Sequence, residues 1–366
     1  MIRTIFSSTL LRISILLIGG LLGLSSAFLP TPQSNPDLDL NDQTPLWKVM
    51  TKLGKINPHP PKNPTDTELI KQGESLVMNG WAMRDGTKSA KLSGKFTCAA
   101  CHISTPEGED LHSIDPELRI RYLEEIDQPF LPGPTFYGMV NRIMFFNDDF
   151  LKRYVGPKAD LLRSSHFNLR DAVDACNQVF GQGRRMKEWE KEAILMYLWS
   201  MELKLGELNL SDKDFEAVKY AVENNRSNAK AVNVMRNYYL EVYPANLEGP
   251  FDPIERRMVS PVVSNFASGR RLYEMSCLHC HEGKRYSKVK LDYKQRTFKK
   301  LRSNFEASSF SIYDAHRYMA SGKNNHRPPV FTAERLSNRQ LQDLRYFIQT
   351  MARMGDEAMK YYGSED

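Results

Sequence analysis

Two Cys-x-x-Cys-His pentapeptides lie about half a chain apart and constrain this chain more than any other feature. They are Cys98-Ala99-Ala100-Cys101-His102 and Cys277-Leu278-His279-Cys280-His281. This spacing attaches c-type haem, because two thiols add across the vinyl groups of one haem and the adjacent imidazole reaches the iron as proximal ligand. The sequence therefore predicts two covalently attached haem c groups, one held by Cys98, Cys101 and His102 and the other by Cys277, Cys280 and His281.

Other uses of a Cys-x-x-Cys spacing fit this sequence less well. A zinc site needs four ligands at matched spacings, and a redox dithiol normally follows a strand in a β-α-β pattern. Neither context is visible, and neither use requires the trailing His. The two motifs take four of the five cysteines, which leaves Cys176 unpaired. An odd cysteine in an oxidising compartment needs an explanation.

The N-terminus has the features of a secretory signal. Arg3 and Arg12 come before a short apolar stretch over 13–24, and Ser25-Ser26-Ala27 follows it. The apolar stretch is too brief for a comfortable transmembrane helix. We expect residues 1–27 to be a signal peptide and the mature protein to be periplasmic, in agreement with haem attachment outside the cytoplasm. Retention of an uncleaved leader as a membrane anchor is the alternative.

Composition places few limits on the partners of this chain. The 366 residues allow two modest domains after the leader. Lys and Arg exceed Asp and Glu by only 6, and four haem propionates would offset much of that excess. Nothing indicates nucleic acid. A locally basic face could steer an acidic redox partner or a small anion, but the sequence does not place one. We expect periplasmic redox proteins as partners.

The order of predicted elements repeats along the chain. A helix from about 65–67 to 77 precedes the first motif, and an amphipathic helix over 187–199 follows it. A short helix over 265–276 runs into the second motif, and a helix over 337–348, capped by Ser337, closes that copy. This order resembles a class I cytochrome c domain. Strand signals are weak, so the expected fold class is all-α, with two tandem class I cytochrome c domains joined by a helical linker.

The predicted boundaries follow from this repeat. The interval 211–240 is charged, lacks Pro and Gly, and has apolar residues at helical spacing, which predicts one or two connecting helices. The predicted segments are a signal peptide (1–27), an extended Pro-rich N-terminal segment (28–64), a first cytochrome c domain (65–207), a helical linker (208–262), a second cytochrome c domain (263–357) and a C-terminal tail (358–366).

The second protein ligand of each iron decides potential and reactivity. Residues 168–177 are expected to form a helix that delivers Cys176 to the first haem, although a lone Cys is also often a small buried hydrophobe. Fallback ligands are Met139, Met144 and Met186. Arginines can contact propionates or an anionic substrate through paired hydrogen bonds, and solvent exposure is their ordinary alternative. The candidates are Arg142, Arg170, Arg184 and Arg185.

The loop over 316–331 offers two equal candidates for the second haem, Met319 and His326, with His316 behind them. Met would raise the potential and suit an electron exit, whereas a second His would lower it. His279, inside the second pentapeptide, is expected to face solvent and receives no role.

The segment Asp171-Ala172-Val173-Asp174-Ala175-Cys176 resembles part of the dihaem cytochromes of inorganic sulfur oxidation. These are the dihaem subunit of the sulfur-oxidising (thiosulfate) system and the dihaem thiosulfate dehydrogenases. They typically ligate the first haem by His and Cys, with that Cys before the closing helix. The resemblance implies that Cys176 is the distal thiolate of the first haem and the site where thiosulfate is oxidised. The chain departs from the family pattern at 181–185 and in its inter-domain insert.

Three functions are compatible with these patterns. An electron-transfer cytochrome needs only the two motifs and is the leading prediction. An enzyme that oxidises thiosulfate or a related sulfur anion needs Cys176 on iron, with Arg170 and Arg184 as further catalytic candidates. A dihaem peroxidase needs a haem with an open coordination position, which the sequence neither favours nor excludes.

Overall fold

The computed structural model describes residues 38–63, 65–146, 156–224, 228–242, 264–286, 289–306, 331 and 335–362. Residues 39–366 form one unit. The predicted signal peptide and the candidate ligands Met319, His326 and His316 lie outside the described residues. We call residues 39–242 the first half and residues 264–362 the second half.

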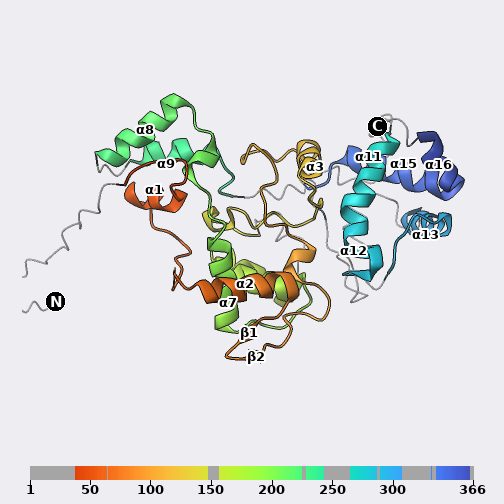
Figure 1. Ribbon diagram of the computed structural model, residues 1–366, viewed down its shortest axis with the longest axis horizontal. Helices are drawn as coiled ribbons and strands as arrows, with labels where there is room; N and C mark the ends of the chain where they lie inside the picture. The colour runs from red at the N-terminus through yellow and green to blue at the C-terminus, as the bar shows by residue number, and fades with distance from the viewer. Residues whose placement is uncertain are drawn as a thin grey trace, which may run out of the picture. The chain divides into compact units, whose positions relative to one another are not determined.

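The described chain is mostly helical, which confirms the all-α prediction (Figure 1). Its one sheet pairs β1 (Met83–Arg84) with β2 (Thr87–Lys88) in antiparallel register. None of the described helices is both long enough and apolar enough to cross a bilayer. The α-helices are α1 (Leu46–Lys52), α2 (Thr67–Asn79), α3 (Pro116–Glu125), α5 (Pro157–Ser164), α6 (Leu169–Val179), α7 (Glu188–Trp199), α8 (Asp212–Glu223), α9 (Ala229–Arg236), α11 (Phe266–Leu272), α12 (His279–His281), α13 (Gln295–Glu306), α15 (Asn338–Met354) and α16 (Asp356–Tyr362).

The remaining helical elements are short 3-10 and π-helical turns. Three-residue or four-residue 3-10 turns are η1 (Cys98–Ala100), η2 (Met139–Asn141), η3 (Leu205–Leu208) and η5 (Glu282–Lys284), and η4 (Tyr273–Leu278) is a π-helical turn. The second pentapeptide therefore continues the helix that α11 begins, whereas the first follows a loop and lies in η1.

Local sequence explains where the principal helices begin. The Asp66 side chain accepts the Leu69 N–H at 2.9 Å and so caps α2. Ser337 and Gln340 form a reciprocal capping box at the start of α15. The predicted helices over 65–77, 187–199, 265–276 and 337–348 are thus present, and α15 continues to Met354.

The two halves repeat one helix crossing. At Gly73 of α2, an added Cβ would lie 1.9 Å from the Ala193 carbonyl oxygen of α7. At Gly269 of α11, an added Cβ would lie 2.1 Å from the Asp343 carbonyl oxygen of α15. In both crossings the next neighbour is an aromatic residue four positions further along the closing helix, Tyr197 or Phe347. Only glycine permits such an approach, so both helix pairs depend on it.

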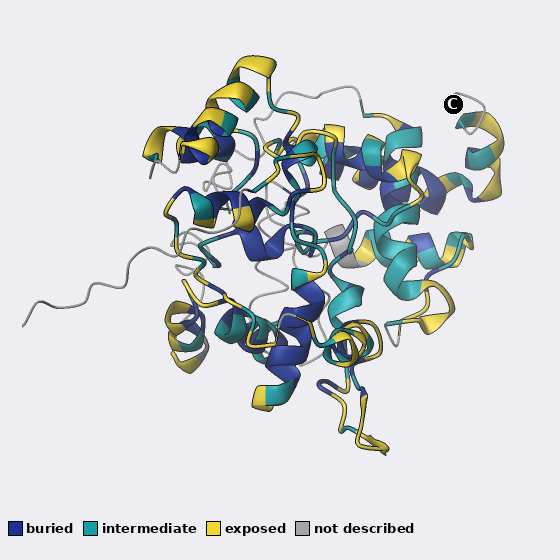
Figure 2. Cartoon of the chain, turned by 60° about the vertical axis from the view of Figure 1, so that its left-hand side comes forward, coloured by how far each residue is buried: buried dark blue, intermediate teal, exposed yellow. Residues whose placement is uncertain are grey.

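Each half has its own core, but the boundary between the cores differs from the boundary between the predicted domains. The first core contains Leu76, Phe136 and Leu198. The second core joins Phe298 and Phe347 to residues that follow the first motif, namely Ile103, Ile120, Leu123, Phe130 and Leu131. Buried residues, dark blue in Figure 2, gather where the helices meet. The stretch 103–131 thus packs into the second core.

The predicted extended segment over 28–64 needs a correction. Within it, α1 is a helix whose Leu46 and Val49 are 0 % exposed. The Leu46 N–H donates to the Leu203 carbonyl at 2.8 Å, and the Trp47 indole N–H donates to the Val140 carbonyl at 2.9 Å. The apolar side of this helix, with Leu53, is therefore core. The Pro-rich flanks concealed one short helix whose partners lie far along the chain.

Candidate haem sites

The first pentapeptide presents His102 in the form that a metal needs. Its Nδ1–H donates to the Pro134 carbonyl at 2.6 Å, and its ring stacks on Phe136 with 4.6 Å between centroids. A carbonyl oxygen can only accept, so Nδ1 carries the proton and Nε2 keeps its lone pair. A partner on the second ring nitrogen is the usual way in which a ligating His is oriented.

Electrostatics keep this imidazole neutral. Burial is the main reason that the pKa of His102 falls to about 4, and the cations of Arg335 and Arg142 lower it further. The Pro134 carbonyl and the Glu107 carboxylate act in the opposite direction. At neutral pH the ring is therefore an uncharged donor of a lone pair.

The second pentapeptide repeats this arrangement. His281 Nδ1–H donates to the Val289 carbonyl at 2.8 Å, which again leaves Nε2 for a metal. His281 ends α12, and Cys277 lies in η4 directly before it. Both predicted proximal histidines are thus oriented by a backbone carbonyl supplied from a following loop.

The four motif cysteines are half-buried and form no disulfide. Burial raises the pKa of Cys98 and of Cys280 to about 11, and that of Cys277 to about 12. It also raises the pKa of Cys101 well above its ordinary value. A thioredoxin-type dithiol instead needs an attacking thiol with a lowered pKa. The environment of these thiols therefore argues against a redox dithiol.

Helix α6 brings Cys176 to the first motif. The Asn168 side chain caps this helix by accepting the Arg170 N–H at 3.0 Å. Burial, followed by the nearby charge of Cys98, raises the pKa of Cys176 to about 12. The charge of Cys176 in turn helps to raise the pKa of Cys101. The fifth cysteine consequently lies near the two cysteines of the first pentapeptide, and all three are half-buried.

The other predicted ligands and anion contacts occupy varied positions. Met186 is buried in the first core, and the Met139 sulfur accepts a hydrogen bond from Arg142 at 3.6 Å. Met144 is half-buried and forms an isolated bridge with Val242. Arg185 is exposed. None of these placements assigns a ligand to the first haem.

Arg170 and Arg184 both pair with buried glutamates. Arg170 forms an ion pair with Glu192 and donates to the Pro60 carbonyl at 2.6 Å. Arg184 forms two hydrogen bonds to Glu190 and further bonds to backbone carbonyls of the 90–91 turn. These contacts fasten α6 and the 181–185 loop to α7. Contact of either arginine with a substrate anion stays a prediction.

One short segment, residues 130–135, joins the first pentapeptide to the two residues directly before the second, and we call it the strap. At its start, the Phe130 N–H donates to the Met275 carbonyl at 3.2 Å, and the Ser276 hydroxyl donates to the Phe130 carbonyl at 2.8 Å. Near its end, the Gly133 N–H donates to the Cys101 carbonyl at 2.8 Å. A Cβ at Gly133 would lie 2.5 Å from the His102 ring, so the strap reaches this ring only because the residue is glycine.

The two pentapeptides also touch each other directly. Cys280 Sγ lies 3.7 Å from the Ala100 carbonyl oxygen, and the His279 ring is hydrogen-bonded to the backbone of Ala99. His279 Nε2 is buried and has no hydrogen-bond partner among the described residues. The expectation that His279 faces solvent is therefore wrong, because the first attachment loop covers it.

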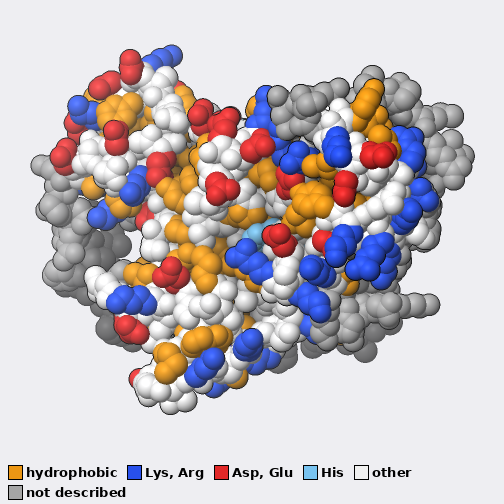
Figure 3. Space-filling model, turned by 45° about the vertical axis from the view of Figure 1, so that its right-hand side comes forward, with side chains coloured by type: hydrophobic (Ala, Val, Ile, Leu, Met, Phe, Trp, Pro, Cys, Tyr) orange, Lys and Arg blue, Asp and Glu red, His pale blue; other side chains and the backbone are white. Residues whose placement is uncertain are grey.

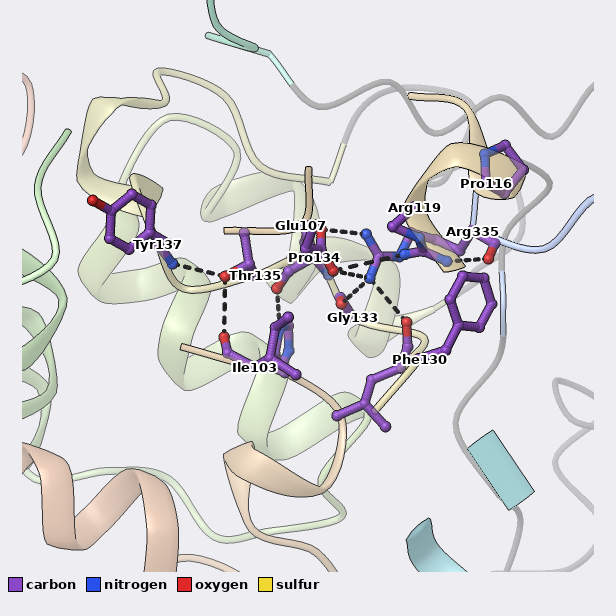
Figure 4. A network of polar contacts seen from close by, with 12 residues as sticks. Ile103, Glu107, Pro116, Arg119, Phe130, Gly133, Pro134, Thr135, Tyr137 and Arg335 are labelled. Atoms are coloured by element: carbon purple, nitrogen blue, oxygen red, sulfur yellow. Dashed lines mark hydrogen bonds and ion pairs between the residues drawn. The ribbon is translucent and has the colours of Figure 1, made fainter. Parts of the chain in front are cut away.

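A buried ionic network is hydrogen-bonded to backbone carbonyls of the strap (Figure 4). Arg335 is 1 % exposed, binds both carboxylate oxygens of Glu107, and donates to the carbonyls of Leu131 at 2.9 Å and Gly133 at 2.6 Å. Arg119 lies 3.7 Å from Glu107 and donates to the Arg335 carbonyl. Sequence reasoning missed this network, because Arg335 and Glu107 are 228 residues apart and belong to no motif.

The side chains at each pentapeptide match those that an attached haem would require. Among the described residues, no three His, Cys, Asp or Glu side chains converge on one point. Haem iron takes four ligands from the porphyrin, so each pentapeptide needs to supply only one oriented imidazole and two thiols.

No protein-family model, no curated protein and no solved structure matches this chain.

Proposed function

We propose that this protein is a periplasmic dihaem cytochrome c that transfers electrons through two covalently bound haems. The observation that carries the proposal is the shared geometry of the two pentapeptides. In each, two half-buried cysteines precede an imidazole whose Nδ1–H is held by a backbone carbonyl, Pro134 for His102 and Val289 for His281. When bound, the haems would supply one-electron chemistry at iron, and the chain would supply attachment and orientation.

The repeated helix crossing supports two tandem class I cytochrome c domains. In each half, a glycine of the helix before the pentapeptide lies against a carbonyl and an aromatic residue of the closing helix. Gly73 and Gly269 play the same part in the two copies. A close, glycine-dependent contact that recurs at equivalent places is expected of a duplicated fold rather than of two unrelated helix pairs.

Contact between the pentapeptides favours transfer from one site to the other. Ala99 and Ala100 meet His279 and Cys280, so the two attachment loops share one interface. The strap adds backbone hydrogen bonds to Cys101 in the first pentapeptide and to Met275, two residues before the second. These contacts hold the sites at a constant separation, which a two-centre electron carrier needs.

A spectroelectrochemical titration of the holoprotein tests this function. We expect two one-electron transitions per chain, because each imidazole ligates its own iron. His281→Gly should alter one transition and leave the other. His112→Gly, at an exposed histidine, is the control and should alter neither. A single transition in the wild-type protein would contradict the proposal.

A second candidate function rests on the position of Cys176. Its thiol is close enough to those of Cys98 and Cys101 for their charges to interact, which supports a role for Cys176 at the first site. We propose as the alternative that this site oxidises thiosulfate, two thiosulfate ions forming one sulfur–sulfur bond in tetrathionate and releasing two electrons. A thiolate ligand stabilises ferric iron, so the first haem would have the lower potential.

Substitution of Cys176 separates the enzyme from the carrier. If the thiolate binds iron, Cys176→Met should abolish the low-spin thiolate signal in electron paramagnetic resonance and reduce thiosulfate-dependent reduction of ferricyanide at least 100-fold. Val173→Met places the same side chain on the same helix and serves as the control. An electron paramagnetic resonance spectrum unchanged by Cys176→Met would contradict the assignment of Cys176 as an iron ligand.

A further inference from the structure

The positive charge of this chain is concentrated directly after the second pentapeptide. Residues 284–306 contain nine Lys and Arg against two Asp and Glu, a net charge of +7. The whole chain has a net charge of +6, so everything outside this segment sums to −1. The modest net charge of the whole chain therefore includes one strongly basic segment, which follows the second pentapeptide.

The side chains of this segment reach solvent. Seven of its cations are exposed, and we call them the basic face: Lys284, Arg285, Lys290, Lys294, Arg296, Lys299 and Lys300. Lys and Arg side chains gather on the right of Figure 3, over the part of the molecule that holds α12 and α13. Within the described residues, no ion pair is formed by Lys284, Lys294, Arg296, Lys299 or Lys300. Arg170 and Arg184, in contrast, are neutralised by partners.

The backbone ties the basic face to the second pentapeptide. The Val289 carbonyl accepts the His281 Nδ1–H, and the Leu291 N–H donates to the His281 carbonyl at 3.3 Å. The Tyr286 N–H donates to the Cys280 carbonyl at 3.0 Å. Lys284, Arg285 and Lys290 therefore belong to the loop that orients the second proximal histidine, and the other four cations lie directly before or within α13.

We propose that the basic face is the docking surface for an acidic redox protein that exchanges electrons with the second haem. This inference rests on the proposed dihaem function. One electron would cross the contact without any bond being made or broken. Complementary charge concentrates such a partner at the face and raises the rate of encounter by 10-fold to 1,000-fold at low salt, as a rough range.

Burial of the apolar side of α13 favours a protein partner over a membrane. A helix that lies in a lipid surface presents large apolar side chains for insertion. On α13, Phe298 is 0 % exposed and Leu301 packs against the second core. The helix therefore offers charge to its surroundings, while its apolar side chains serve the fold.

The test compares two matched triple variants of the haem-loaded protein. Lys294→Glu/Lys299→Glu/Lys300→Glu reverses the basic face. Lys71→Glu/Lys213→Glu/Lys230→Glu makes the same change of charge at exposed lysines of the first half. Lys294→Gln/Lys299→Gln/Lys300→Gln removes the charge without adding repulsion. Haem content is measured first, because a protein without two haems would refute the proposed function itself.

Reduced protein is then oxidised by ferricyanide, an anion, and by tris-phenanthroline cobalt(III), a cation, in a stopped-flow instrument. At low salt we expect the Glu variant of the basic face to react about 10-fold more slowly with ferricyanide and faster with the cobalt complex, with the Gln variant in between. The first-half variant should change by less than about twofold, and all differences should shrink at high salt. Two haems with equal rates in both Glu variants would overturn the docking surface and leave the proposed function standing.

Acylation of lysines, read by mass spectrometry, identifies the class of partner. Poly-glutamate should protect Lys294, Lys299 and Lys300 from acylation, while vesicles of phosphatidylglycerol at the same salt concentration should protect them less. Stronger protection by the vesicles than by poly-glutamate would contradict a protein partner and point to the membrane surface.

Discussion

Arg335 shows how much a single residue can contribute to this structure. It comes from the second half, yet its guanidinium holds the strap that orients His102 in the first half. The Glu107 carboxylate neutralises it in a buried setting. Loss of one partner in such a pair leaves an uncompensated charge away from water, which costs far more than loss of a surface pair.

We predict that Arg335→Gln lowers the free energy of unfolding by about 3–5 kcal/mol, as expected for a broken buried ion pair. Denaturant titration of the holoprotein measures the change. Arg163, whose ion pair with Asp160 is on the surface, provides the control, and Arg163→Gln should cost less than about 1 kcal/mol. Equal effects of the two substitutions would show that Arg335 does not support the strap.

The same network should tune the potential of the first haem. A cation near His102 disfavours the extra positive charge of ferric iron, so Arg335→Gln should lower that potential and Glu107→Gln should raise it. Shifts of the same sign in the two variants would contradict this electrostatic account, and a purely structural role would not predict opposite signs.

Glu202 should make stability depend on pH. It accepts the Trp47 N–H at 2.7 Å at the start of α1, and burial raises its pKa to about 7. Because folding raises this pKa, the contribution of the Glu202 carboxyl to the free energy of unfolding is fully present below about pH 4.5. That contribution is lost as the pH rises through about 7. We predict that Glu202→Gln, measured by denaturant titration, stabilises the protein by about 1–3 kcal/mol at pH 8 and has little effect at pH 4.5. A variant with the same pH dependence as wild type would refute this.

Sequence and structure agree best where chemistry dictates spacing. The pentapeptides and the helix that carries Cys176 were predictable, because thioether attachment and helix capping both leave local signatures. The Glu107–Arg335 pair and the contact of His279 with the first pentapeptide were not, since each depends on a partner that is distant in the sequence and leaves no local pattern.

At the scale of helices, the structure depends on two glycine crossings. Alternating charge and apolar spacing predicted α2, α7, α11 and α15, but no pattern showed which pairs would meet. Helix α1 escaped prediction because it has only seven residues and lies among prolines. Short helices are defined by tertiary contacts rather than by their own propensity.

We predict that Gly73→Ala and Gly269→Ala each lower the free energy of unfolding by about 3 kcal/mol or more, since each added methyl group would overlap a carbonyl oxygen. Thermal unfolding of the holoproteins measures the loss. Gly94→Ala is the matched control, because an added Cβ there meets nothing within 4 Å, and it should change stability by less than about 1 kcal/mol. Similar behaviour of all three variants would remove the support for a repeated crossing.

At the scale of the whole molecule, the two pentapeptides and the residues around them pack together. The stretch 103–131 follows the first pentapeptide yet packs into the second core, and the strap then returns to His102. Hydrophobic spacing predicted a repeat with a linker but could not reveal this exchange, because apolar periodicity identifies a buried face and not its partner. The overall net charge likewise gave no sign of the basic face, which the structure shows to be exposed and next to the second pentapeptide.

The intact mass of the protein, after expression with a cytochrome c maturation system, shows whether both pentapeptides carry covalently bound haem. We expect the mass of the chain plus two haems, falling by one haem in Cys98→Ser/Cys101→Ser and by one in Cys277→Ser/Cys280→Ser. A wild-type mass without haem, or with one haem that neither double substitution removes, would contradict it.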